Sequence, residues 1–245
     1  MSSILTLLSV SIHRSNSSQE EMADSGTETK TLLRGLPSLK GPFRPLDITS
    51  LPNTPHEAFH DWLQDAINNN VKEPHAMTLS TVDEHGYPDA RVLILKNLDH
   101  RGWHFAIKAD SPKGRQITNN PAVALTFYWP QLGRQIRIRG VATELPDSES
   151  AADFLERPAG SKVTALASKQ SEVLADTATL ERNLKGAREK IEAQPEYVAP
   201  AWKVFAVAPK TVEFWQGATD RMHQRLRFRV SNEQDGTWSR DVLYP

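Results

Sequence analysis

The residues with the clearest potential for chemistry form a basic run between positions 221 and 230. The run reads Arg221-Met222-His223-Gln224-Arg225-Leu226-Arg227-Phe228-Arg229-Val230. Alternate side chains of a β-strand share a face, so in a strand the four arginines and the histidine would lie on one side. Cations about 7 Å apart repel each other unless an anion lies among them. The run therefore indicates an anion-binding site or, alternatively, a solvated edge strand whose arginines pair with acids.

Two other segments contain basic residues, and the first of them favours the anion site. Gln135, Arg137 and Arg139 alternate with isoleucines on a neighbouring candidate strand. Arg91 and Lys96 flank an apolar stretch of four residues, but one lies at an odd position and the other at an even one. A flat strand would therefore place these two cations on opposite faces, and periodicity alone does not bring them together.

A rival motif is the segment His56-Glu57-Ala58-Phe59-His60, which matches the H-E-x-x-H pattern of zinc peptidases. On a helix, two histidines four residues apart can bind zinc, with the glutamate as general base. Glu57 is explained equally well as the third residue after a helix N-cap at Thr54. The segments that follow offer no clear third ligand, so the simpler interpretation is two exposed helix histidines, and no metal site is predicted.

Composition limits the possible functions. The 245 residues include no cysteine, which excludes disulfides, thiolate nucleophiles and iron–sulfur clusters. A formal net charge of −1 gives no overall attraction for a polyanion, and the aromatic residues do not interleave with the basic run, so no nucleic-acid partner is expected. No run of about 18 apolar residues occurs, and the short stretch 4–12 does not resemble a signal peptide. We expect a cytoplasmic protein without a membrane partner.

The elements that must position these residues are read from hydrophobic periodicity. Residues 1–45 are predicted to form a disordered tail, within which Met22 resembles a second translation start, and 46–245 a single domain. Thr54 as N-cap and Pro55 at the first helical position predict a helix that ends near residue 70. Further helices are expected at 147–156 and after Asp176.

The remaining periodicity is that of strands. The strand-like segments are 76–82, 88–96, 103–109, 122–129, 134–145, 201–208, 211–216, 223–230 and 237–243. Short connections at 83–86 and 99–102 suit hairpins, so consecutive strands should be antiparallel and form a meander that curls into a barrel. The predicted fold class is mainly β or α+β, an antiparallel β-barrel with peripheral helices.

Several motifs resemble the pyridoxamine 5′-phosphate oxidase family. Glu213-Phe214-Trp215-Gln216-Gly217, followed by Arg221-x-His223-x-Arg225, is similar to the family's C-terminal signature. Earlier matches in the same order are Ala90 to Lys96, Ser111-x-Lys113-Gly114, Asn119-Asn120-Pro121, Phe127-Tyr128-Trp129, Arg134-Gln135, Arg157-Pro158 and Ser168-Lys169-Gln170-Ser171. The resemblance runs from about residue 54 to the end of the sequence.

This resemblance implies a split β-barrel homodimer with FMN bound at the subunit interface. The cofactor-binding residues it implies are Arg91, Val92, Leu93, Ile94, Leu95, Lys96, Lys113, Gln135, Gln170, Ser171, Trp215 and Arg225, with Gln170 and Ser171 reaching across from the other subunit. Arg91 and Lys113 would neutralise the FMN phosphate.

The implied reaction oxidises pyridoxamine or pyridoxine 5′-phosphate to pyridoxal 5′-phosphate, with molecular oxygen as acceptor and hydrogen peroxide as product. Arg221 and His223 match the pair that packs the substrate ring against the flavin and would be the catalytic residues. Lys96, Arg157 and Ser161 match residues that bind the substrate phosphate.

The sequence departs from the family pattern in four places. Asp153 replaces a tyrosine that binds the substrate phosphate, Pro112 an arginine and Gln224 an aspartate. The N-terminal arginine–tyrosine pair that usually covers the substrate has no clear counterpart near Arg34. A carboxylate at position 153 would repel a phosphate dianion. The alternative is therefore a flavin oxidase of the same fold that acts on another substrate, such as a phenazine-type metabolite. Two further alternatives are a zinc peptidase and a binding module without catalysis.

Overall fold

The computed structural model describes residues 26–43, 47–232 and 236–245. The chain divides into two units, Met1–Lys40 and Gly41–Pro245. In the first unit, residues 26–35 form a helix with exposed side chains, which the sequence pattern does not predict. The expectations for residues 1–25, including the start at Met22, lie outside the described residues. None of the helices in the described ranges is both long and apolar enough to cross a membrane. All features below belong to the second unit.

Helix α2 (Pro55–Asn68) follows a short 3-10 turn, η1 (Ile48–Ser50), and begins where the sequence predicts. Thr54 Oγ1 accepts a hydrogen bond from the backbone N of Glu57 at 3.3 Å and donates one to the Glu57 carboxylate at 2.7 Å. The first bond satisfies a backbone N–H that the first turn of a helix leaves unpaired, so the predicted N-cap at Thr54 is confirmed. The Glu57 carboxylate supports the cap through the Thr54 hydroxyl.

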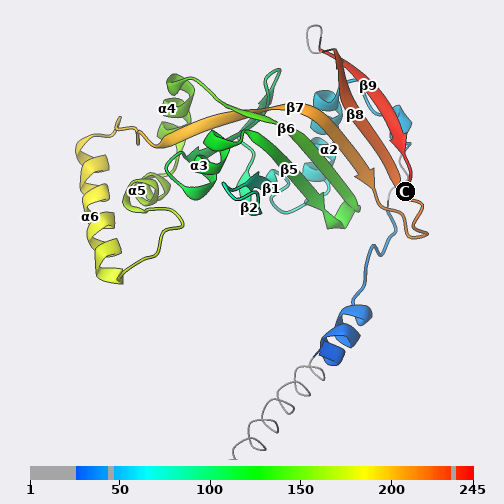
Figure 1. Cartoon of the computed structure of the whole chain (residues 1–245), viewed down its shortest axis with the longest axis horizontal. Coiled ribbons are helices and arrows are strands. Elements are labelled where there is room, and N and C mark those ends of the chain that lie inside the picture. Colours follow the sequence, from blue (N-terminus) through cyan, green and yellow to red (C-terminus); the bar gives the residue numbers. More distant parts are fainter. Residues whose placement is uncertain (1–25, 44–46, 233–235) are drawn as a thin grey trace, which may run out of the picture. The chain divides into compact units, whose positions relative to one another are not determined.

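The strands form one antiparallel sheet, shown in Figure 1. Its members in the described residues are β1 (Ala76–Val82), β2 (Pro88–Ile94), β3 (Asn97–Asp99), β4 (Gly102–Lys108), β5 (Ala122–Trp129), β6 (Arg134–Glu144), β7 (Trp202–Gln216), β8 (Gln224–Asn232) and β9 (Thr237–Leu243). The order is β2-β1-β5-β6-β7-β4-β3, and β8 and β9 extend from β7. An antiparallel sheet with helices outside it confirms the predicted fold class.

The predicted meander is wrong at β4. This strand pairs with β7, while β5 pairs with β1. The chain can leave the sheet here because helix α3 (Pro112–Asn119), which the periodicity does not predict, connects β4 to β5. Segments 201–208 and 211–216, expected as two strands, are one strand whose register with β6 shifts at Gly140. A Cβ on Gly140 would lie 2.2 Å from the carbonyl oxygen of Ala208, so only glycine permits this approach.

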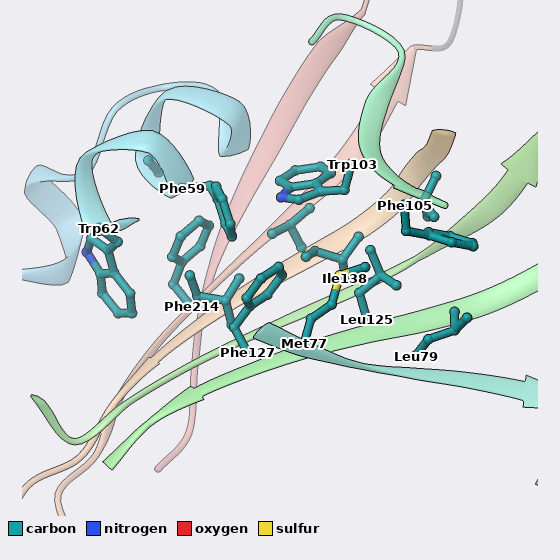
Figure 2. Close-up of a cluster of buried hydrophobic side chains, with 14 of the residues drawn as sticks. Phe59, Trp62, Met77, Leu79, Trp103, Phe105, Leu125, Phe127, Ile138 and Phe214 are labelled. Carbon is teal, nitrogen blue, oxygen red and sulfur yellow. The ribbon is translucent and has the colours of Figure 1, made fainter. Parts of the chain in front are cut away.

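The main core lies between α2 and the sheet. Figure 2 shows Phe59 and Trp62 of α2 directed toward Phe127 and Phe214 of the strands. The ring centroids of Phe59 and Phe127 are 4.9 Å apart, and those of Trp62 and Phe214 are 5.1 Å apart. Burial of each such side chain stabilises the fold by about 1.5–3 kcal/mol. These contacts fix the strands that carry the candidate site.

Three further helices follow β6 (Figure 1); the first packs against β7, and the other two pack against each other. They are α4 (Asp147–Glu156), α5 (Ala159–Ala167) and α6 (Thr177–Ala193). The helices α4 and α6 agree with the sequence prediction, whereas α5 was not predicted. Phe154 of α4 packs against Trp202, the first residue of β7, and this contact fixes the wall of the site described below.

Candidate functional site

A cavity of about 740 Å³ collects many of the predicted site residues. Its walls come from β2, β4, the start of α3, helices α4 and α5, and the segment after α5. The lining residues are Val92, Leu93, Ile94, Lys96, Ala106, Ile107, Lys108, Lys113, Asp153, Glu156, Arg157, Pro158, Gly160, Ser161, Thr164, Ala165, Ser168, Gln170 and Trp202. Basic side chains therefore gather around one cavity, as an anionic ligand requires.

Lys113 forms the cationic centre of one end of the cavity. It lies in the first turn of α3, which Ser111 caps, and it is only 5% exposed. Its Nζ donates to Gln170 Oε1 at 2.8 Å and to Ser111 Oγ at 3.3 Å, and both acceptors are neutral. Burial, together with the nearby charge of Arg91, lowers the pKa of Lys113 to about 8. A buried cation at a helix N-terminus with neutral partners is suited to bind a phosphate.

Arg91 is close enough to Lys113 for their charges to interact, but it is not among the residues that line the cavity. Its guanidinium donates to Thr81 Oγ1 at 2.6 Å and forms an ion pair with Asp89 at 2.5 Å. The positive charge of Arg91 contributes to the lowered pKa of Lys113, but the Arg91 guanidinium is already paired with Thr81 and Asp89. Direct contact of Arg91 with a bound phosphate therefore stays a prediction.

A second group of lining residues, called the Lys96 end below, is built around Lys96. The predicted strand 88–96 ends at Ile94, and the chain turns so that the backbone N of Lys96 donates to the carbonyl of His104 at 2.8 Å. Lys96 therefore lies outside the strand, and the expectation that it faces away from Arg91 does not apply. Its side chain lines the cavity. Leu95, a predicted cofactor residue, instead packs against the core.

An acidic residue occupies the Lys96 end of the cavity. Lys96 Nζ lies 2.9 Å from Asp153 Oδ1, and Trp202 Nε1 donates to Asp153 Oδ2 at 2.8 Å. The guanidinium of Arg157 lies 3.9 Å from the centre of the Trp202 ring and donates to the carbonyl of Ser161 at 3.2 Å. Burial lowers the pKa of Arg157, and Asp153 opposes this effect. The three predicted phosphate-binding residues are thus brought together with a carboxylate between two of them.

A second group of predicted residues lies across the start of β6, the end of β7 and the start of β8. Gln135 pairs with Trp215 in register, and Trp215 pairs with Arg225, so the three form one row. The imidazole of His223 lies 4.9 Å from the Trp215 ring, and its Nδ1 accepts from the backbone N of Ala218 at 3.0 Å. Arg221 adopts a left-handed φ of 70° in the preceding loop. None of these five residues lines the cavity described above.

The prediction that an anion binds along the whole basic run is wrong. The strand begins at Gln224, so Arg221 and His223 lie in a loop instead of on a common strand face. Arg225 forms an ion pair with Glu213 at 2.7 Å, and Asp241 of β9 binds Arg227 at 3.1 Å and Arg229 at 2.8 Å. Hydrogen bonds from Arg229 and Arg227 lower the pKa of Asp241. Carboxylates of neighbouring strands therefore neutralise most of the run, as the alternative expects, but β8 lies between β7 and β9 and is not an edge strand.

Gln170 and Ser171 were expected to reach across from another subunit. Gln170 instead contacts Lys113 of the same chain, and Ser171 follows it with a left-handed φ of 68°. Sequence reasoning also missed Ala106, Ile107 and Lys108 of the cavity wall. Their strand is correctly predicted, but no local signal distinguishes them from other residues of a buried strand.

The H-E-x-x-H residues do not converge on a common point. His56 stacks on Trp103 with ring centroids 4.9 Å apart, and Glu57 is used in the helix cap. His60 has a 75% exposed side chain and lies beside Asp61. Within the described ranges, no cluster of three or more histidine or acidic residues has the geometry to hold a metal ion.

Comparisons with known proteins extend this picture. Residues 63–191 match the family model described as pyridoxamine 5′-phosphate oxidase, and residues 202–245 match the one described as pyridoxine 5′-phosphate oxidase C-terminal dimerisation region. A pyridoxine/pyridoxamine 5′-phosphate oxidase of Pseudomonas paraeruginosa is 42% identical over 202 residues, which cover 82% of this chain and 93% of that protein. One from Synechocystis is 44% identical over 191 residues, covering 78% and 88%.

Two solved structures have a similar fold. PhzG from Burkholderia lata, in complex with tetrahydrophenazine-1-carboxylic acid, has a TM-score of 0.77 and 28% identity, covering 84% of this chain and all of that one. A pyridoxamine 5′-phosphate oxidase-related, FMN binding protein from Nostoc punctiforme has a TM-score of 0.64 at 18% identity, with coverages of 78% and 98%. The sheet of the present chain is therefore a split barrel of the same type.

Proposed function

The chain belongs to the pyridoxamine 5′-phosphate oxidase family, and from this premise we propose that it is an FMN-dependent oxidase that converts pyridoxamine or pyridoxine 5′-phosphate to pyridoxal 5′-phosphate. Molecular oxygen is the acceptor and hydrogen peroxide the second product. The cytoplasmic location expected from the sequence stays a prediction.

The observation that carries the proposal is the environment of Lys113. Its ammonium group is buried, lies in the first turn of a helix and has hydrogen bonds only to the neutral side chains of Gln170 and Ser111. Such a group gains most from an anion that enters the cavity. The phosphate of FMN fits this requirement, and the residues present therefore suit the cofactor that the family implies.

The two groups of predicted residues support a site shared by two copies of the chain. Lys113, Gln170 and Lys96 lie at the cavity, whereas the row Gln135, Trp215 and Arg225 lies outside its lining. The matched C-terminal dimerisation region spans 202–245 and thus includes Trp215 and Arg225. We infer that the row of one copy completes the cavity of the other, so that each dimer holds two sites.

The chain's own residues would act by binding and orientation. FMN, when bound, accepts a hydride and passes the electrons to oxygen. Because His223 Nδ1 accepts the N–H of Ala218, the neutral imidazole carries its proton on Nε2, which can donate to the substrate. Arg221 lies in the same loop, and its guanidinium would lie close to the amine or alcohol group of the substrate that is oxidised. Trp215 packs beside His223 and fixes the ring in place.

The direct test is the visible spectrum of the purified protein, mass identification of the released cofactor, and turnover of pyridoxamine 5′-phosphate. We expect a flavin spectrum, FMN, and equal amounts of peroxide and pyridoxal 5′-phosphate. Absence of turnover at saturating FMN would refute the substrate, and failure to bind FMN would refute the cofactor. Lys113→Met should weaken FMN binding, whereas Lys210→Met, in the middle of β7, should not.

A second candidate is oxidation of a phenazine-type substrate. It is favoured by the ion pair between Lys96 and Asp153, which places a negative charge where a phosphate would bind. The similarity to PhzG, whose structure contains tetrahydrophenazine-1-carboxylic acid, agrees with this alternative. Comparing kcat/KM for that compound and for pyridoxamine 5′-phosphate decides between the two candidates.

A further inference from the structure

Two groups of residues in the cavity lining differ in how their cations are balanced. Within the described part of the chain, Lys113 donates to the neutral side chains of Gln170 and Ser111 and forms no ion pair. Lys96 forms an ion pair with Asp153 at 2.9 Å. An incoming anion thus meets an ammonium group without an ion-pair partner at Lys113 and a paired one at Lys96.

Asp153 is held firmly in this position. One carboxylate oxygen accepts from Lys96 and the other from the indole of Trp202 at 2.8 Å. Its side chain is 16% exposed and lies on α4, where the neighbouring Phe154 is fully buried against Trp202. The carboxylate therefore belongs to the wall of the cavity and is not a mobile surface group.

This arrangement changes which substituent the Lys96 end can accept. Lys96 and Arg157 carry two positive charges, and Asp153 and Glu156, which line the same cavity, carry two negative ones, so these four side chains leave no excess positive charge. A phosphate dianion must approach the carboxylate or separate it from Lys96, and both cost free energy. An uncharged hydroxymethyl group can instead donate to Asp153 and accept from Lys96 or Arg157, so that all the polar groups stay paired.

We propose that Asp153 is a specificity-determining residue, through which the protein oxidises unphosphorylated pyridoxamine and pyridoxine as well as their 5′-phosphates. The inference rests on the proposed function. For pyridoxine, the carbinol carbon loses a hydride to FMN and its hydroxyl loses a proton, which yields the aldehyde; oxygen takes up the electrons and two protons as hydrogen peroxide. For pyridoxamine, the same loss yields an imine, which water hydrolyses to the aldehyde and ammonia.

The test compares kcat/KM for pyridoxamine 5′-phosphate and for pyridoxamine in the FMN-loaded wild-type protein and in Asp153→Asn. The substitution retains the shape of the side chain and removes its charge. We expect the wild type to oxidise both compounds, and the variant to shift the ratio toward the phosphorylated one by about tenfold or more, mainly through KM. The Kd of inorganic phosphate, measured by calorimetry, should fall in the same variant.

Asp147→Asn is the matched control. Asp147 lies on the same helix and also pairs with a lysine, Lys203 at 2.5 Å, but it does not line the cavity. The ratio should stay within about twofold of wild type in this variant, because the removed charge lies outside the site. An equal shift in both variants would overturn the inference.

The remaining outcomes separate the inference from the proposed function. Turnover of the phosphorylated compound with an unchanged ratio and an unchanged Kd for phosphate in Asp153→Asn would overturn the inference alone. No turnover of either compound by FMN-loaded protein would overturn the proposed function and, with it, the substrates named here.

Discussion

The affinity for FMN should depend on pH through Lys113. In the cavity without a ligand, burial and the neighbouring charge of Arg91 lower the pKa of Lys113 to about 8. A phosphate dianion bound beside the ammonium group would favour its protonated form and raise this pKa again. Binding is therefore strongest at pH values where Lys113 is already protonated, and it weakens as the pH rises through 8.

The size of the effect follows from the same pKa. Near pH 7 about nine-tenths of the Lys113 side chains are protonated, and near pH 9 only about one-tenth are. Because binding must then include uptake of a proton, the Kd for FMN should rise about tenfold between pH 7 and pH 9. The phosphate itself is dianionic above a pH of about 6 to 7, so its own titration does not produce this slope.

The assay is quenching of FMN fluorescence during titration with protein freed of cofactor. Lys113→Arg keeps a positive charge that does not titrate in this range, so its Kd should be nearly constant from pH 7 to 9. Lys113→Met should bind FMN roughly 10- to 100-fold more weakly at pH 7, also without a slope. A constant Kd in the wild type, or the same slope in Lys113→Arg, would refute this account of the site.

Three other predictions concern assembly and stability. At an FMN concentration that loads the wild type but neither variant, mixing Lys113→Met and Trp215→Ala chains should restore about a quarter of the wild-type activity, because half of the dimers are mixed and each holds one intact site. Activity no higher than in either parent would exclude shared sites. Phe59→Ala should lower the free energy of unfolding by about 3–5 kcal/mol in urea titrations, because Phe59 is fully buried. Thr54→Ala should cost about 1 kcal/mol through loss of the helix cap, and an unchanged urea midpoint would contradict this role.

Local patterns predicted the elements of the fold better than their partners. The start of α2 could be read from Thr54 and Pro55 because a helix cap is formed by residues close in sequence. Strands such as β1 and β5 follow from alternation. The pairing of β4 with β7 joins segments about 100 residues apart, and no sequence pattern near residue 105 predicts this pairing. The meander failed for that reason, since it assumes that neighbours in sequence pair in the sheet.

The candidate site shows the same division. The resemblance identified Lys96, Lys113 and Arg157, and the structure places all three on one cavity. It also flagged Asp153 as a departure from the family, but only the structure shows that this carboxylate pairs with Lys96 and Trp202. Such contacts join the connection between β2 and β3 to α4 and β7, so they depend on tertiary packing that periodicity does not encode.

Whether a cation can bind a ligand depends on the carboxylate that a neighbouring element brings to it. The basic run contains the densest positive charge in the sequence, yet Glu213 and Asp241 from adjacent strands neutralise Arg225, Arg227 and Arg229. Lys113 lies in a segment with fewer cations, yet it contacts neutral partners and keeps its charge available. A cation that already forms an ion pair must lose that pair before it can bind a ligand, which costs free energy. An anion that binds Lys113 replaces only neutral hydrogen-bond acceptors, whose bonds are weaker. Free energy for binding phosphate should therefore come mainly from Lys113 and less from the longer run of arginines.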